Sequence, residues 1–205
     1  MNQSKLYTMK TISDFHDRHE PQKIRIVLSW KCDADLDLSL CALNKYLDCI
    51  GHVSFKDNDY FDNNSIKHLK PIRYENKEEG GEENVTVKLF QLPHQVKTLL
   101  VVITSYNKVP FNKLTPAPMI KFVDNTNKVD LFELMSYKLS SISSKTGLLF
   151  GALQRVTHKP WHFVPLFDYC RENKPYDAHR VFIERLKGVN TIADFIDAHQ
   201  DDISE

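Results

Sequence analysis

Hydrophobic and polar residues alternate in two neighbouring stretches near the start of the chain. In residues 23–30 (KIRIVLSW) every second residue is large and apolar, and in residues 36–42 (LDLSLCA) leucines alternate with polar or small residues. A period of two is typical of a β-strand with one buried face, because successive side chains of a strand point to opposite sides. The pattern therefore predicts two strands, the second of which begins inside a group of aspartates.

Further runs of the same apolar, β-branched character follow along the chain. Polar segments rich in Asn, Asp and Ser, such as residues 56–65 and 124–128, separate them and are typical of turns. Eight or nine short strands at this spacing, with no helices between them, predict an all-β fold, an antiparallel β-sandwich. The further runs are residues 49–55, 84–91, 98–105, 118–123, 129–139, 148–157 and 161–167.

The pattern becomes helical near the C-terminus. Residues 178–187 carry apolar residues at helical spacing and end before Gly188, and Thr191 with Asp194 has the spacing of a capping box. We therefore expect an N-terminal extension (1–22), a sandwich domain (23–168) and a C-terminal extension with two short helices (169–205). We expect the apolar helix faces to cover the chain's own core, the alternative being that they receive a partner.

Three aspartates, Asp33, Asp35 and Asp37, lie within five residues. Carboxylates at this density repel one another unless a cation lies among them, and a set made only of oxygen donors favours a hard ion such as Ca²⁺. An EF-hand is excluded, because its sixth position needs Gly and its twelfth a bidentate Glu, whereas this chain has Leu38 and Asn44 there.

A second acidic segment, residues 75–84 (ENKEEGGEEN), offers carboxylates around Gly80 and Gly81. Glycines permit the backbone to turn carboxylates and carbonyls toward one ion. We predict that the two segments share a Ca²⁺ ion at one end of the sandwich. The alternative is that the second segment is only a solvated hairpin turn. The predicted metal ligands are Asp33, Asp35, Asp37, Glu78, Glu82 and Glu83.

Charge and composition limit the classes of function. Among the 205 residues, Lys and Arg number 27 and so do Asp and Glu, so no net positive field favours nucleic acid. No apolar run reaches the roughly 18 residues of a membrane-spanning helix, and the N-terminus lacks the apolar stretch of a signal peptide. We therefore expect a soluble cytoplasmic protein whose four cysteines, none of them in a CxxC pair, are reduced thiols.

Four separated segments, in order over about residues 24–167, resemble the TerD-type tellurium-resistance family of stress proteins. Family members carry a Trp followed by a DxDLDxS motif, a glycine-acid loop leading into a strand, a strand ending in Asp, and a hairpin with a GELYR-type signature. The matching segments here are LSWKCDADLDLSL (28–40), ENVTVKLFQLPHQVKTLLVVIT (83–104), MIKFVDNTNKVDLFELMSYKL (119–139) and TGLLFGALQRVTHKPWHFVPL (146–166).

The resemblance implies a β-sandwich that binds calcium between the DxDLD turn and the glycine-acid loop. Asp33, Asp35 and Asp37 match the first motif, and residues 81–83 match the Gly-Asp-Asp of the second. The second loop departs from the family, with Glu in place of Asp, Asn84 in place of Glu, and Gly80 in place of Asp. These departures imply weaker calcium binding or the loss of one of two ions.

We find no nucleophile elbow, P-loop or HExxH motif, so we expect no enzyme activity. The first hypothesis is a calcium-binding stress-response module that stabilises the fold and assembles with other proteins, such as members of a stress-response complex. The alternative is a calcium-independent interaction scaffold. Calcium-dependent membrane attachment ranks last, because only Trp30 and Lys31 offer an aromatic or basic tip near Asp33. The scaffold would dock through Phe182, Leu186, Phe195 and Ile196.

Overall fold

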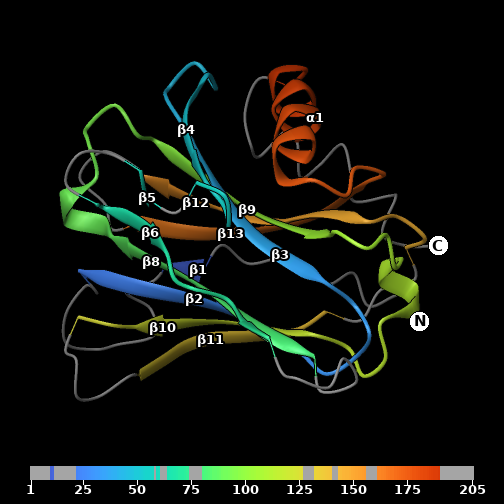
Figure 1. The fold of residues 1–205 in the computed structure, drawn as a ribbon. Coiled ribbons are helices and arrows are strands. Elements are labelled where there is room, and N and C mark those ends of the chain that lie inside the picture. Colours follow the sequence, from blue (N-terminus) through green and yellow to red (C-terminus); the bar gives the residue numbers. More distant parts are fainter. Residues whose placement is uncertain are drawn as a thin grey trace, which may run out of the picture.

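The computed structural model describes most of the chain as two packed sheets and one helix (Figure 1). The described residues are 10–11, 22–57, 59–60, 64–73, 80–126, 132–139, 143–155 and 161–189.

All strand pairs in the described residues are antiparallel. The six-stranded sheet has the order β1 (Lys10–Thr11), β13 (Trp161–Cys170), β12 (Gly147–Arg155), β9 (Thr98–Ser105), β3 (Leu36–Leu43) and β4 (Cys49–Val53). The seven-stranded sheet has the order β11 (Phe132–Lys138), β10 (Met119–Asp124), β2 (Lys23–Trp30), β8 (Gly81–Lys88), β6 (Ile66–His68) and β5 (Asp59–Tyr60), and β7 (Ile72–Arg73) also pairs with β8. The predicted antiparallel sandwich is confirmed.

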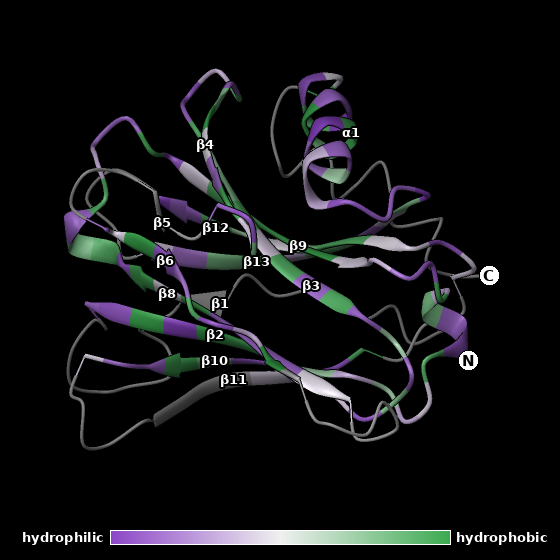
Figure 2. Cartoon of the chain, viewed as in Figure 1, coloured by the Kyte–Doolittle hydropathy of each residue, from purple (hydrophilic) through white to green (hydrophobic). Residues whose placement is uncertain are grey.

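The alternation seen in the sequence decides which side chains fill the space between the sheets. In β2 the apolar residues from Ile24 to Trp30 are buried and their neighbours are partly exposed, as predicted for a strand with one core face. In β3 every residue is buried, because one face meets the other sheet and the opposite face lies beneath the helix. Figure 2 shows hydrophobic positions in the facing strands of both layers.

The helix α1 (Pro175–Lys187) packs on the outer face of the six-stranded sheet, over β3, β9 and β12. Pro175 opens the first turn, where its missing N–H needs no partner. Ala178, Phe182 and Leu186 recur at helical spacing and are at most 1% exposed. The helix predicted over residues 178–187 is therefore confirmed, and its apolar face covers the chain's own core. The second predicted helix, from Thr191, lies outside the described residues.

Several boundaries differ from the sequence prediction. Strand β8 begins at Gly81, three residues before the predicted start, and the predicted last residues of that strand form a 3-10 turn, η3 (Leu89–Gln91). Part of the N-terminal segment, β1, pairs with β13. Nine of the strands in the described residues have five or more residues, and four have only two or three. Within these same residues, no helix combines the length and the apolar content needed to cross a membrane.

Candidate functional site

The two acidic segments approach each other where β2 and β8 lie side by side. Trp30, the last residue of β2, is paired with Gly81, the first residue of β8. Gly80 has a positive φ of 78°, and a Cβ at this position would overlap the carbonyl oxygen of Trp30. Only a glycine fits so closely against that backbone. The end of the second acidic segment therefore lies directly against the start of the first.

The aspartate turn is held by its own backbone and by a third segment. Trp30 Nε1 donates to the carbonyl oxygen of Ala34 at 2.7 Å. Asn107 Oδ1 accepts a hydrogen bond from the Asp35 N–H at 3.1 Å, and Asn107 Nδ2 donates to the Asp33 carbonyl at 3.4 Å. The turn is thus tied to the residues that follow β9. Sequence reasoning did not find Asn107, because no local pattern marks a residue that is distant in the chain.

The three aspartates differ in environment. Asp33 is exposed and Asp35 is partly buried, both before the first residue of β3. Asp37 lies within β3 and is only 3% exposed. Leu36 and Leu38 belong to the core between the sheets, so alternation places Asp37 on the outer face of the six-stranded sheet, together with Ser39.

Glu83 is buried between the two sheets and links them by hydrogen bonds. Its Oε2 accepts a hydrogen bond from the Leu38 N–H at 2.5 Å and lies 3.2 Å from His68 Nε2. The side chains of Glu83 and His68 are both 0% exposed. His68 Nδ1 lies 2.8 Å from the Leu69 carbonyl oxygen, so the ring connects Glu83 to the backbone that follows β6. The Oε2 atom of Glu83 therefore already contacts two protein groups.

The other two predicted ligands from the second segment have different positions. Glu82 lies in β8, not in a loop, and its Oε1 accepts a hydrogen bond from Asn84 Nδ2 at 2.8 Å. Glu78 lies outside the described residues. The expectation that residues 82 and 83 belong to a turn is wrong, because β8 begins at Gly81 and pairs with β2 from that residue on.

The donor set is chemically suited to calcium, but the described residues do not complete a cage. Carboxylate oxygens of Asp33, Asp35, Asp37 and Glu82 are hard donors of the kind that Ca²⁺ takes. In the described part of the chain, no three His, Cys, Asp or Glu side chains gather closely enough to hold a metal ion.

A Ser–His contact lies under α1 but lacks the features of a catalytic site. Ser39 Oγ and His179 Nε2 are 2.9 Å apart, and these residues are 0% and 3% exposed. His179 Nδ1 has no hydrogen-bond partner among the described residues, so no acid orients the ring as in a catalytic triad. Burial lowers the pKa of His179 to about 3, with His52 adding to the shift. The ring therefore packs as a neutral group at neutral pH.

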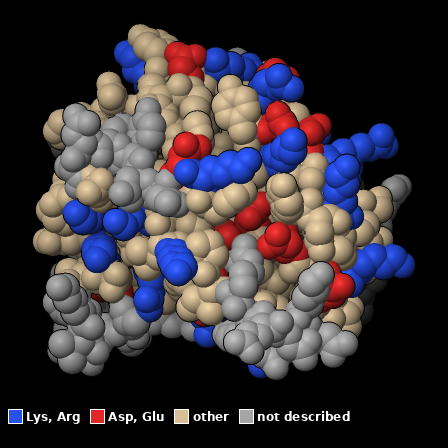
Figure 3. Space-filling view, viewed as in Figure 1, with Lys and Arg blue, Asp and Glu red and all other residues tan. Residues whose placement is uncertain are grey.

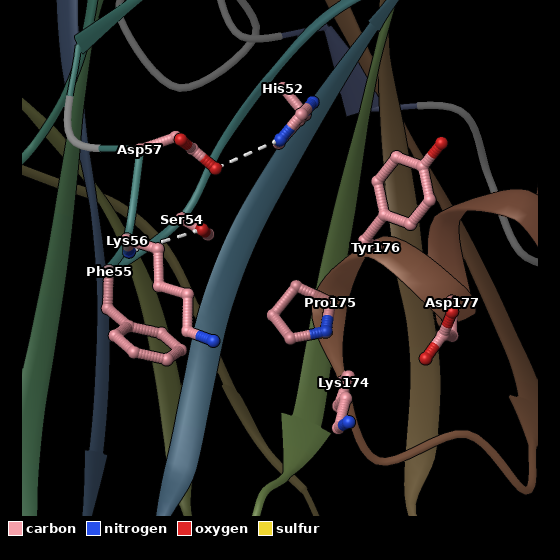
Figure 4. A pocket seen from close by; sticks show the side chains of 9 residues that line it. All are labelled: His52, Ser54, Phe55, Lys56, Asp57, Lys174, Pro175, Tyr176 and Asp177. Atoms are coloured by element: carbon pink, nitrogen blue, oxygen red, sulfur yellow. Dashed lines mark hydrogen bonds and ion pairs between the residues drawn. The ribbon is translucent and has the colours of Figure 1, made fainter.

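A cleft of about 220 Å³, partly open to solvent, lies between the end of β4 and the start of α1 (Figure 4). Its walls are residues 52 and 54–57 on one side and residues 174–177 on the other. On the β4 side, His52 Nε2 lies 3.1 Å from Asp57 Oδ2. Both signs of charge line the cleft. On the face shown in Figure 3, basic and acidic side chains are likewise interspersed.

Comparisons with known proteins identify the family of this chain. A model described as the TerD domain matches residues 11–167. The tellurium resistance protein TerZ of Serratia marcescens is 33% identical over 101 residues, which are 49% of this chain and 49% of TerZ. The alignment thus spans about half the length of this curated relative.

Two solved structures share the fold. A protein of unknown function superposes with a TM-score of 0.63 at 14% identity, covering 78% of this chain and 96% of its own. A Streptomyces coelicolor A3(2) homologue of the telluride resistance protein TerD superposes with a TM-score of 0.61 at 12% identity, covering 77% of this chain and 95% of its own. At these identities the likeness concerns the sandwich architecture.

Proposed function

The chain belongs to the TerD domain family, and from this premise we propose that it is a non-catalytic, calcium-binding module of a stress response. One observation carries the proposal: Gly80 and Gly81 seat the second acidic segment against Trp30, at the start of the aspartate turn. An ion bound there joins two segments that are about fifty residues apart in the sequence. Its effect is to stabilise the folded chain and to order a surface for partner proteins of the response.

The buried contacts of Glu83 refine the list of ligands. Its Oε2 already accepts from Leu38 and faces His68, so we assign Glu83 the role of holding β3 and β8 together beside the site. The proposed ligands are then Asp33, Asp35 and Asp37, with Glu82 and Glu78 from the second segment. Calcium takes six to eight oxygens, so backbone carbonyls and water complete the set.

Calorimetric titration of the full chain with Ca²⁺ tests the proposal. We expect heat of binding in the wild type and its loss in a variant carrying both Asp35→Asn and Asp37→Asn, because the two substitutions remove two anionic ligands and keep the side-chain size. Asp57→Asn is the matched control, since Asp57 is an exposed acid that contacts His52 in the cleft by α1. Equal heats in the wild type and in the double variant would rule out this site.

Thermal unfolding gives an independent measure. At a free Ca²⁺ concentration one hundred times Kd, binding to the folded state adds about 2.7 kcal/mol. For a chain of this size the melting temperature should rise by roughly 5–10 °C over its value in chelator. An identical melting temperature in millimolar Ca²⁺ and in chelator would contradict the proposed ion.

Part of the docking surface predicted for the calcium-independent scaffold is buried in the structure. Phe182 and Leu186 are 0% and 1% exposed because they pack against the outer face of the six-stranded sheet. They are not available to a partner while α1 is in place. Phe195 and Ile196 lie outside the described residues.

A further inference from the structure

Two cysteines meet across the hairpin formed by β3 and β4. Cys41 is in β3, and Cys49 is the first residue of β4, which pairs with β3 through Leu43. Their Sγ atoms are 3.3 Å apart and not bonded. The turn between them is braced, because Asn44 Oδ1 accepts hydrogen bonds from the N–H groups of Tyr46 and Asp48. The hairpin therefore holds the sulfurs in contact.

The two thiols differ in access. Cys41 is 0% exposed and packs in the cluster beneath α1, whereas Cys49 is exposed. A small oxidant in solution can reach Cys49 and cannot reach Cys41 while α1 is docked. The other two cysteines, Cys32 and Cys170, are half-buried and buried, respectively, and have no sulfur contact of this kind among the described residues.

We propose that Cys41 and Cys49 form an oxidisable thiol pair, in which Cys49 reacts with a hydroperoxide and Cys41 then closes an intrachain disulfide. This proposal is independent of calcium binding. It rests on the sulfur contact, on the braced hairpin and on the unequal exposure of the two thiols.

The protonation of the pair agrees with these roles. The hydrogen bond that the Cys41 thiol donates to Cys49 Sγ is the largest cause that lowers the pKa of Cys49 to about 6. Partial burial opposes this shift, and the contact with the Gly51 carbonyl and the nearby His52 lower the pKa further. The same bond raises the pKa of Cys41 well above its ordinary value. At pH 7 Cys49 is therefore mostly thiolate, which is the nucleophilic form. Asp48, the other charged group next to it, forms an ion pair with Lys187 of α1.

The reaction balances in two steps. The Cys49 thiolate attacks the terminal peroxide oxygen, so that an S–O bond forms and the O–O bond breaks. Hydroxide leaves from hydrogen peroxide, and alkoxide leaves from an alkyl hydroperoxide and is protonated by water to the alcohol. Cys41 Sγ then attacks Cys49 Sγ, so that the S–S bond forms and the S–O bond breaks. The departing hydroxyl takes the Cys41 proton as water. Two thiols are oxidised, and the hydroperoxide is reduced to water or to water and an alcohol.

The test uses the reduced full-length chain with one equivalent of hydrogen peroxide at pH 7, followed by peptide mapping without reductant. We expect a linked peptide pair containing Cys41 and Cys49, a loss of two hydrogens from the intact mass, and full reversal by dithiothreitol. Cys32 and Cys170 should still take up an alkylating reagent and serve as internal controls. Oxidation at Cys32 or Cys170 as fast as at Cys49 would overturn the proposal.

Matched variants separate the two roles. In C41S the sulfenic acid on Cys49 should persist and be trapped by dimedone, whereas C49S should leave Cys41 reduced and C32S should behave as the wild type. In the wild type, Cys49 should be alkylated several-fold faster than Cys32 at pH 7, with a midpoint near pH 6. If C41S fails to fold, the peptide map of the wild type still tests whether Cys41 and Cys49 form a disulfide. A wild-type product with Cys49 over-oxidised and Cys41 unlinked would refute the pair.

Discussion

We expect acidification to weaken the attachment of α1, through the buried His179. This residue is 3% exposed, and its Nε2 lies 2.9 Å from Ser39 Oγ in β3. Its ring centre is 6.3 Å from that of His52. Burial disfavours the charged ring, and His52 opposes it further, so the pKa of His179 is lowered from 6.5 to about 3. A proton can be added only by breaking the packing beneath the helix.

Proton linkage gives the size of the effect. Because folding lowers the pKa of His179, the unfolded chain takes up the proton first as the pH falls. This contribution to stability is fully present above about pH 6.5 and is lost progressively as the pH falls toward 3. Between pH 7 and pH 5 the loss in the free energy of unfolding amounts to about 2 kcal/mol.

Denaturant unfolding of the wild type and of His179→Gln, each at pH 7 and at pH 5, measures this loss. Glutamine can still hydrogen-bond to Ser39 and does not titrate. Histidines elsewhere in the chain contribute equally to both proteins, so the difference between the two pH dependences isolates position 179. We expect the wild type to lose about 2 kcal/mol more than the variant. Equal pH dependence in the two proteins would refute the account.

Two substitutions test other parts of the fold. Gly80→Ala should lower the free energy of unfolding by about 1–3 kcal/mol, because Gly80 has a positive φ and a Cβ there would overlap the Trp30 carbonyl. Gly188→Ala is the control: Gly188 has a φ of −74°, so this substitution should change the melting temperature little. Asp168→Asn removes the carboxylate that receives Arg185 Nη1 at 2.6 and 2.7 Å, and should cost about 1–2 kcal/mol and speed amide exchange in α1. Unchanged exchange in α1 would show that this ion pair does not hold the helix.

The alternation of apolar and polar residues in the sequence predicted most of the strands. Strands such as β2 and β9 follow their predicted ranges, because each has one or two buried faces whose period can be seen in the sequence. The start of β8 could not be found in this way. Two glycines between acids are typical of a turn, and the burial of Glu83 depends on Leu38 and His68, which are far from it in the sequence.

The candidate site could be predicted only in part, again because some of its residues are far apart in the sequence. The aspartates stand out because they are adjacent in sequence, whereas Asn107 reaches them only through the pairing of β9 with β3. The contact between Cys41 and Cys49 likewise depends on a register shift in the β3–β4 hairpin, next to Leu43. Cross-strand neighbours follow from register, and a register shift of this kind has no local signal in the sequence pattern.

The proposed calcium site and the proposed thiol pair lie at different positions along β3. Asp37 and Cys41 share the outer face of β3 and are four residues apart, about 13 Å along the strand. Ser39 lies between them and contacts His179, so α1 covers the interval and shields Cys41. In the described residues, the second acidic segment contacts β3 near its start, where Glu83 accepts a hydrogen bond from the Leu38 N–H. Chelation of calcium should therefore leave the Cys41–Cys49 reaction unchanged, whereas undocking of α1 should expose Cys41 and remove the difference in access between the two thiols.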